Sequence, residues 1–371
     1  MKVLYILHTT GWDGSAHSLL NMIHSVRDSV YPIVLFRNKC AVYEYYTAEG
    51  IECIVFPFSQ NTKKSSERKG VAYLRKLARH IVSNTISVIY LYFAFRKRSI
   101  DIVHTNSGVT DLGYPLSKVL GARHVVHLRE FQDIDFGIEP LTGWKRFFRN
   151  LASADARIAI TEAVFRHFHL ENYENSFRLF NAVLPLGATA LMEKERYFLF
   201  CSAFLHEAKG VDFCLEAFAR SELRSSGYSL YIIGKKGDMA YYANLLSIIN
   251  KYGISDNVKF IGVVKDVKPF MERASAFLMC SKNEGFGRVT AEAMFYGCPV
   301  IARNSGGSPE FIAHKQSGFL FDTMEDCINC MKEVATTDTS SIVKSAQEFA
   351  MDNFSEESYG NKILDIYSKI I

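Results

Sequence analysis

Two glutamates in the second half of the chain, Glu284 and Glu292, stand eight positions apart and enclose the loop Gly285-Phe286-Gly287. Carboxylates accept hydrogen bonds from hydroxyl groups, so the pair suits a ribose or another sugar. The residues after the loop, from Arg288 to Tyr296, are expected to form a helix. Its first N–H groups, near Arg288, have no partner within the helix and favour phosphate. The pattern predicts a ligand in which a diphosphate lies between two sugars.

The elements that must position these residues can be predicted from the flanking sequence. The apolar run Ala276–Cys280 is typical of a short buried parallel strand, and Val300-Ile301-Ala302 of the next strand. Gly306-Gly307 then opens another loop. Each piece also has an ordinary interpretation: the glycine loop can be a structural turn, and Glu292 a solvated helix residue.

The whole string from Ser281 to Gly307, followed by Ser308-Pro309-Glu310, resembles the E-x7-E signature of the retaining glycosyltransferases of family four. The resemblance implies an α/β protein of the GT-B fold, with two Rossmann-like doubly wound domains facing a cleft. It also implies that Glu292 binds the ribose of a nucleotide-sugar donor and that Glu284 binds its sugar hydroxyls as a catalytic residue. The remaining substrate-binding residues expected in this stretch are Phe286, Gly287, Arg288, Val289 and Thr290.

Length and composition agree with a two-domain enzyme. A chain of 371 residues with 48% hydrophobic and 22% charged residues is sufficient for two globular domains. A net charge of +4 is too small to indicate nucleic acid as a partner. The eight cysteines form no disulfide framework, and the amino-terminal residues are typical of a strand rather than a signal peptide, which predicts a cytoplasmic protein. The lone Cys327-Ile328-Asn329-Cys330 motif is expected to bind no metal.

We expect an acceptor-binding domain at residues 1–185, a nucleotide-sugar-binding domain at 186–350, and a final helix at 351–371 that packs back on the first domain. The linker is expected at about Pro185 to Glu195. The first domain opens with a strand, a loop containing Gly14 and Ser15, and a helix, which together offer N–H groups to an anion. Structural turns use the same residues. By resemblance, this loop contacts the donor diphosphate. His127, at a later strand end, is expected by the same resemblance to be a catalytic residue that contacts the donor sugar, although a histidine there can also be structural.

The second domain begins with the strand Tyr197 to Ala203, which leads to Lys209-Gly210. In the resembled family an arginine and a lysine here neutralise the donor diphosphate. Lys209 matches the lysine and is expected to be catalytic, but Phe204 stands where the arginine is expected. Phenylalanine cannot make bidentate phosphate contacts, so this departure puts activity in doubt. Gly234, Gly262 and Val264 match segments that lie near the nucleotide.

A strongly basic segment occupies residues 63–98, with ten lysines and arginines and one glutamate. From Val71 onward, Val71, Leu74, Ala78 and Ile81 fall at helical spacing. Such a helix could lie on an anionic membrane surface, or be a buried crossover helix with a solvated basic face. Its apolar part is shorter than the roughly 20 residues that span a bilayer.

These observations predict a metal-independent, retaining glycosyltransferase without a cofactor. It would move a sugar from a UDP- or GDP-linked donor to a glycan or lipid-linked acceptor in surface polysaccharide biosynthesis, in the cytoplasm or at the inner face of the cell membrane. A second hypothesis is a protein of the same fold that binds sugar nucleotide, or a partner enzyme, without transferring sugar. A third is a nucleotide-sugar epimerase, which would need further acid and base carboxylates.

Overall fold

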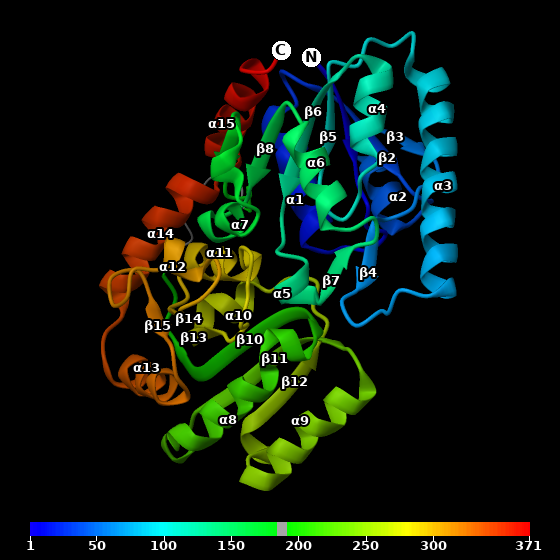
Figure 1. The fold of residues 1–371 in the computed structure, drawn as a ribbon. Helices are drawn as coiled ribbons and strands as arrows, with labels where there is room; N and C mark the ends of the chain where they lie inside the picture. Colours follow the sequence, from blue (N-terminus) through cyan, green and yellow to red (C-terminus); the bar gives the residue numbers. More distant parts are fainter. Residues whose placement is uncertain (184–190) are drawn as a thin grey trace. The chain divides into compact units, whose positions relative to one another are not determined.

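The computed structural model describes residues 1–183 and 191–371, which form two compact units (Figure 1). Unit 1 contains Met1–Ala182 and Glu356–Ile371, and unit 2 contains Val183–Ser355. The expected domain boundary at 185/186 lies outside the described residues, as does most of the expected linker. The carboxyl-terminal helix α15 (Glu356–Ser368) belongs to unit 1.

Unit 1 is built on a seven-stranded parallel sheet with the order β3-β2-β1-β5-β6-β8-β9. Its strands are β1 (Lys2–Ile6), β2 (Tyr31–Phe36), β3 (Glu52–Val55), β5 (Ile102–Thr105), β6 (Arg123–Leu128), β8 (Ala156–Ala159) and β9 (Ser176–Arg178). The hairpin-like pair β4 (Thr62–Lys64) and β7 (Ile138–Pro140) is antiparallel. The central strands β1 and β2 are mostly apolar because helices cover both faces of the sheet.

One face of this sheet packs against α1 (Gly14–Val26), α2 (Ala41–Ala48) and α15, and the other against α3 (Val71–Phe95) and α4 (Gly113–Leu120). The alternation of side chains along β1 divides the two cores: Val3 and Tyr5 face the first set of helices, and Leu4 and Ile6 the second. The remaining helices of unit 1 are α5 (Asp133–Phe136), α6 (Trp144–Ala152), α7 (Glu162–His167) and the short η1 (Leu170–Asn172).

Unit 2 is built on a six-stranded parallel sheet with the order β12-β11-β10-β13-β14-β15. Its strands are β10 (Glu195–Leu205), β11 (Ser229–Lys236), β12 (Val258–Gly262), β13 (Ala274–Met279), β14 (Val300–Arg303) and β15 (Phe319–Phe321). From β10 the chain proceeds outward through β11 and β12, then returns to β13 on the other side of β10. The order of the strands therefore reverses between β10 and β13, where α/β sheets bind their ligands.

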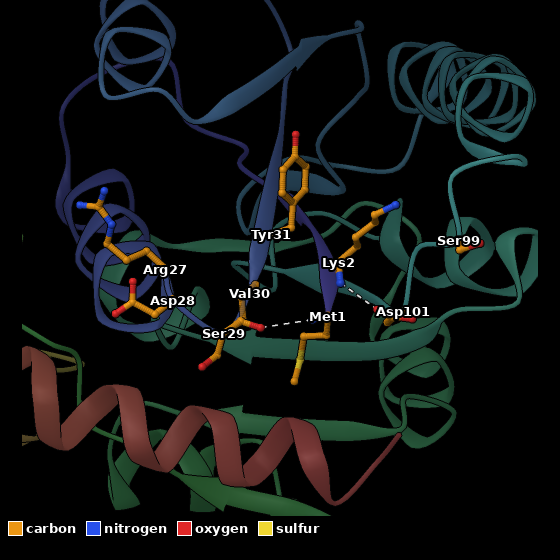
Figure 2. Close-up of a pocket in the computed structure, with 9 residues that line it drawn as sticks. All are labelled: Met1, Lys2, Arg27, Asp28, Ser29, Val30, Tyr31, Ser99 and Asp101. Atoms are coloured by element: carbon orange, nitrogen blue, oxygen red, sulfur yellow. Dashed lines mark hydrogen bonds between the residues drawn. The ribbon is translucent and has the colours of Figure 1, made fainter.

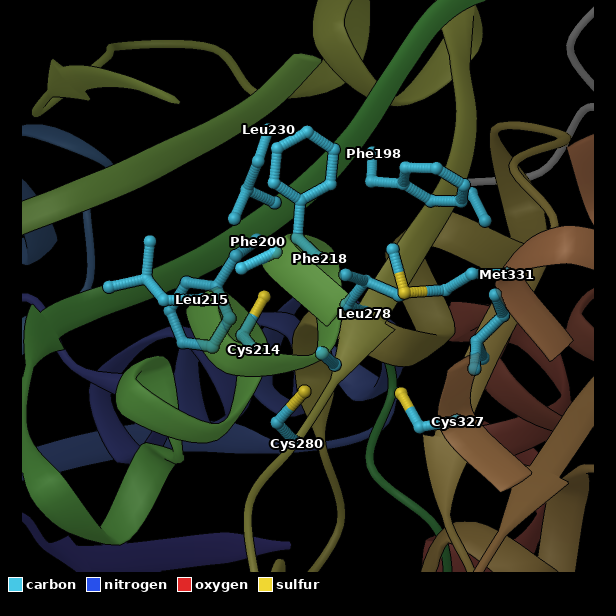
Figure 3. Close-up of a cluster of buried hydrophobic side chains, with 14 of the residues drawn as sticks. Phe198, Phe200, Cys214, Leu215, Phe218, Leu230, Leu278, Cys280, Cys327 and Met331 are labelled. Carbon is cyan, nitrogen blue, oxygen red and sulfur yellow. The ribbon is translucent and has the colours of Figure 1, made fainter. Parts of the chain in front are cut away.

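Helices α8 (Val211–Ser221), α9 (Met239–Tyr252) and α13 (Met324–Thr336) cover one face of this sheet. Figure 3 shows the core that they enclose, in which Phe198, Phe200 and Phe218 lie beside the thiols of Cys214, Cys280 and Cys327. The other helices are α10 (Lys268–Arg273), α11 (Arg288–Phe295), α12 (Ser308–Phe311), α14 (Ser340–Phe354), η2 (Glu207–Lys209), η3 (Leu223–Ser226) and η4 (Ser255–Asn257). Both cysteines of the Cys327/Cys330 pair are free and buried, and burial raises the pKa of the Cys330 thiol to about 11.

Helix α3 packs against the sheet, as a crossover helix does, but not through the face that the spacing predicts. The predicted apolar face is exposed, with Val71 at 66% and Leu74 at 60% of full accessibility, and the basic side chains of the helix are also exposed. The side turned toward the sheet carries His80, Asn84 and Ser87 before Leu91 and Phe95. Within the described ranges, no helix is both long and apolar enough to cross a membrane.

Candidate functional site

The expected catalytic residues of unit 2 meet at the reversal of strand order. Lys209 ends the short helix η2 that follows β10, and Glu284 lies in the loop after β13. Lys209 Nζ donates to Glu284 Oε2 at 2.8 Å, and the two side chains are 32% and 16% exposed. A cation and a carboxylate that are partly open to solvent at this edge of the sheet can contact a phosphate and a sugar hydroxyl respectively.

The loop that carries Glu284 is fixed by the glycines after β14. Gly306 has a φ of +60°, and a Cβ at this position would collide with the backbone carbonyl oxygen of Glu284. The Gly307 N–H donates to the same oxygen at 2.9 Å. Any side chain at Gly306 would therefore displace Glu284, which gives the Gly-Gly pair a role in positioning the carboxylate.

Helix α11 begins beside this loop. Its cap, Gly287, has a φ of +75°, which L side chains rarely adopt. The N–H groups of the first turn, those of Arg288 and Val289, have no partner within the helix. The hydroxyls of Ser281 and Thr290 and Arg288 Nη1 are buried and have no hydrogen-bond partner among the described residues. Buried polar atoms of this kind indicate that a polar ligand completes the site.

Two of the expected binding residues in this stretch, Glu292 and Phe286, have side chains that already contact other residues of unit 2. Glu292 Oε1 accepts from Arg288 Nε at 2.9 Å within α11. Burial raises the pKa of Glu292, and Arg288 opposes that rise. The Phe286 ring is 4% exposed and packs against Phe311 and Phe354, so only the Phe286 backbone is left for a ligand.

The other expected residues of unit 2 lie at the same edge of the sheet. Gly234 lies near the end of strand β11 and has a φ of +153°. Gly262 is the last residue of β12 and has a φ of +84°. Val264, in the loop after β12, is half-buried. Phe204, which stands where the family has arginine, is 53% exposed near the end of β10, and Lys235 Nζ lies 5.8 Å from the centre of its ring. A lysine therefore lies next to the position at which the resembled family has an arginine.

In unit 1 a carboxylate already caps the N-terminus of α1, which follows the loop after β1. Asp13 accepts from the N–H groups of Ser15 and Ala16, both at 3.0 Å, and Gly14 is the first residue of α1. Ser15 Oγ accepts from the side-chain amide of Asn106 at 3.0 Å. A phosphate at this helix N-terminus would have to displace Asp13, so the expected roles of Gly14 and Ser15 remain predictions.

His127 is completely buried at the end of β6. Its Nδ1 lies 3.2 Å from Arg129 Nη2, and its Nε2 has no partner among the described residues. Burial, together with the nearby Arg129, holds the pKa of His127 well below its usual value, so the ring is neutral. Arg129 is itself fixed by Asn106, whose backbone and side-chain oxygens both accept from its Nε at 3.0 Å, and by the side chain of Asn181.

The carboxylate of Glu130 follows β6 directly after Arg129. Ser107 Oγ donates to Glu130 Oε1, and burial raises the pKa of Glu130 to about 7. Gln132, at a φ of +73°, is buried, and neither side-chain polar atom has a partner among the described residues. No sequence signal distinguishes Gln132, because its conformation and its isolation arise from the fold.

Two negative findings complete the description. No cluster of three or more histidine, cysteine, aspartate or glutamate side chains in residues 1–183 and 191–371 is arranged to hold a metal ion. A cavity of about 590 Å³ in unit 1 is lined by Met1, Lys2, Tyr31 and Asp101, among others (Figure 2). It lies at the amino ends of β1 and β2, opposite the edge at which parallel sheets bind ligands, and we assign it no function.

The chain is similar to known glycosyltransferases. Residues 187–335 match the family of glycosyl transferases group 1. The matched region contains Lys209, Glu284 and α11. An uncharacterized glycosyltransferase of Haemophilus influenzae is 30% identical over 141 residues, which is 38% of each chain. A GDP-mannose-dependent phosphatidylinositol monomannoside mannosyltransferase of Mycobacterium tuberculosis is 34% identical over 137 residues, 34% of this chain and 35% of that one.

Each of these two alignments therefore spans less than half the length of the relative. The likeness to solved structures extends over the whole chain. HepE of Anabaena in complex with UDP superposes with a TM-score of 0.79 at 20% identity and covers 100% of both chains. At this identity the likeness shows the fold alone. The chain has the GT-B fold of two Rossmann-like domains, as predicted.

Proposed function

We propose that this protein is a retaining, metal-independent glycosyltransferase. It would transfer a sugar from a UDP- or GDP-linked donor to a glycan or lipid-linked acceptor in surface polysaccharide biosynthesis. The observation that carries the proposal is the pairing of Lys209 with Glu284 beside the N-terminus of α11, where Ser281, Thr290 and Arg288 keep buried polar atoms without partners. The names of similar proteins include UDP-glucose, as a ligand of HepE, and GDP-mannose, and both of these are nucleotide sugars.

In the proposed reaction the bond between the anomeric carbon and the donor diphosphate breaks, and negative charge builds on the departing phosphate oxygen. Lys209, Arg288 and the free N–H groups of α11 would stabilise that charge without moving. The acceptor hydroxyl would attack on the face that the diphosphate leaves and give its proton to the departing oxygen. Glu284 would hold the sugar hydroxyls, Glu292 the ribose, and residues of unit 1 would bind the acceptor.

We further propose that the protein works at the cytoplasmic face of the cell membrane and contacts it through residues 63–98. The exposed apolar side of α3 and the basic residues of this segment support that placement. The mannosyltransferase relative carries the name of a phosphatidylinositol-based acceptor, which is consistent with a lipid-linked acceptor here.

A second candidate function is favoured by one observation. Phe204 leaves the donor diphosphate without the arginine of the resembled family, and the ring is exposed near the end of β10. The chain could therefore bind a sugar nucleotide, or a partner enzyme, without transferring sugar. The two candidates differ in turnover and agree in donor binding, so both must be measured.

The test is a donor screen with UDP- and GDP-sugars, with and without an extract of lipid-linked acceptors, in which released nucleoside diphosphate is quantified. Acceptor-dependent release from one donor is expected. Glu284→Gln should lower that rate on the order of a hundredfold. Glu207→Gln is the matched control, because this exposed carboxylate lies two residues from Lys209 and should leave the rate unchanged.

Donor binding is followed in parallel by thermal shift. Stabilisation by a donor without release under any condition would establish the binding protein and refute the transferase. Release that survives Glu284→Gln undiminished would remove Glu284 from the mechanism.

A further inference from the structure

Unit 1 contains a groove whose lining includes part of the basic segment 63–98. It has a volume of about 300 Å³ and lies between α3, the start of α4 with the preceding Asp111, and α6. We refer to it as the α3–α4–α6 groove. One part of its lining is polar and includes His80, Asn84, Asp111 and Arg146. The other part is apolar and comes from α3 and α4.

The polar part is preorganised around Asp111. His80 Nε2 lies 3.2 Å from Asp111 Oδ1, and the side-chain amide of Asn84 donates to the same oxygen at 3.1 Å. His80 is 3% exposed, and its Nδ1 has no hydrogen-bond partner among the described residues. A buried polar atom without a partner is unfavourable, and a ligand hydroxyl, which can both donate and accept, would satisfy it.

The charge at the mouth of the groove comes from α6. This helix carries Lys145, Arg146 and Arg149 and no acidic residue. Arg146 lines the groove and is exposed, and none of these three side chains forms an ion pair within the described part of the chain. A guanidinium in this position suits a phosphate, to which it can donate two parallel hydrogen bonds.

The apolar part continues onto the surface of α3. Its lining comprises Ile81, Val88 and Ile89 of α3 together with Tyr114 and Pro115 of α4. Ile81 and Ile89 are 48% and 54% exposed and also belong to the outward apolar side of α3. A hydrocarbon chain lying along these residues would cover apolar surface that otherwise faces water, which favours binding.

We propose that the α3–α4–α6 groove binds one molecule of a phosphate-bearing amphiphile. The phosphate lies on Arg146, a hydroxyl of the head group faces the His80–Asp111 pair, and the aliphatic chain follows Ile81, Val88 and Ile89. The site is contained within unit 1, and it deepens the membrane contact proposed for residues 63–98, on which it rests. Binding there does not require that unit 2 transfers sugar.

The experiment measures binding of 1-octanoyl lysophosphatidic acid to the full-length chain by titration calorimetry, at concentrations below micelle formation. This probe carries a phosphate, a free hydroxyl and one chain. Glycerol 3-phosphate supplies the phosphate and hydroxyls without the chain, and monooctanoylglycerol supplies the chain without the phosphate. The complete probe should bind at least about tenfold more tightly than either part.

Three variants locate the site. Arg146→Gln should weaken binding of the probe about tenfold or more, and Val88→Trp, which fills the groove, should abolish it. Lys145→Gln is the matched control: it removes the same charge from α6 at a residue outside the lining, and should change affinity less than about twofold. An unchanged urea unfolding curve followed by tryptophan fluorescence would show that unit 1 of each variant is folded, because both tryptophans belong to unit 1. Donor binding, measured separately by thermal shift, would separate failure of this site from failure of the donor site.

Equal affinity for glycerol 3-phosphate would reduce the site to an anion contact and overturn the proposal. Undiminished binding by Val88→Trp, or equal losses in Lys145→Gln and Arg146→Gln, would also overturn it. So would binding to phosphatidylglycerol vesicles without binding to the monomeric probe, because that result would assign the lipid contact to the outer surface of α3.

Discussion

At the scale of single residues, Phe204 determines how complete the donor site is. Lys209 and Arg288 supply positive charge, and each is paired with a glutamate. The ammonium group of Lys235 lies over the Phe204 ring. We expect Phe204→Arg to raise the rate of nucleoside diphosphate release by about tenfold or more, because a guanidinium would bind the departing phosphate. The side chain is 53% exposed, so the free energy of unfolding should change by less than about 0.5 kcal/mol.

The rate is measured under saturating donor and acceptor, and stability by urea unfolding. Phe204→Leu serves as the control, since it removes the ring without adding charge and should leave the rate near that of the natural chain. Equal rates for the arginine and leucine variants would show that the lysines already satisfy the diphosphate.

Glu130 gives unit 1 a pH dependence that can be measured. Burial raises its pKa from 4.5 to about 7, so between these values the folded protein keeps a proton that the unfolded chain releases. Stability from this group is therefore complete below pH 4.5 and falls as pH rises through 7. Relative to Glu130→Gln, the natural chain should lose up to about 3 kcal/mol of unfolding free energy across this interval.

Urea unfolding of both proteins at pH 5 and at pH 8 provides the comparison, and Glu174→Gln, an exposed carboxylate of the same unit, provides the control. A constant difference between the natural chain and Glu130→Gln at the two pH values would place Glu130 in contact with solvent and contradict the prediction.

At the scale of elements, the sequence predicts strands better than it predicts which side of a helix is buried. The apolar runs of β13 and β14, and the glycine loop before α11, could be located because each satisfies a local requirement. The pattern of α3 also predicts a helix. Its apolar residues face outward, however, because the sheet receives His80, Asn84 and Ser87, whose partners come from residues far away in sequence such as Asp111 and Pro57.

The outward side of α3 leads to a prediction about membranes. The double variant Ile86→Gln/Phe93→Gln should reduce sedimentation with phosphatidylglycerol vesicles at least about tenfold, because both side chains are more than half exposed and would insert among the lipids. Its stability should be within about 0.5 kcal/mol of the natural chain. Met239→Gln, which alters an equally exposed apolar residue in unit 2, should sediment as the natural chain does. Equal sedimentation of the double variant would leave α3 without a membrane role.

At the scale of the whole molecule, the α/β fold with two Rossmann-like domains was predictable, and the grouping of site residues was only partly so. Lys209 and Glu284 are 75 positions apart, and only the resemblance to a family pairs them, because no local rule relates the end of β10 to the end of β13. No sequence pattern indicated the α3–α4–α6 groove. Most of its lining residues come from three helices whose packing depends on the complete sheet.

The last prediction concerns the packing of the carboxyl-terminal helix in unit 1. Helix α15 joins unit 1 from the far end of the sequence: Tyr359, Ile363 and Tyr367 are buried in its core, and Tyr367 Oη lies 2.7 Å from His104 Nδ1. Gly360 lies against α1 so closely that a Cβ would collide with the backbone carbonyl oxygen of Ser25, which cannot move aside as a side chain can. Gly360→Ala should therefore cost about 1–3 kcal/mol of unfolding free energy. Asn361→Ala, at the next and exposed position, should change it by less than about 0.5 kcal/mol.

Urea unfolding followed by tryptophan fluorescence reports on unit 1, because Trp12 and Trp144 both belong to it. Equal stability of the two variants would mean that α15 can shift away from α1 without loss.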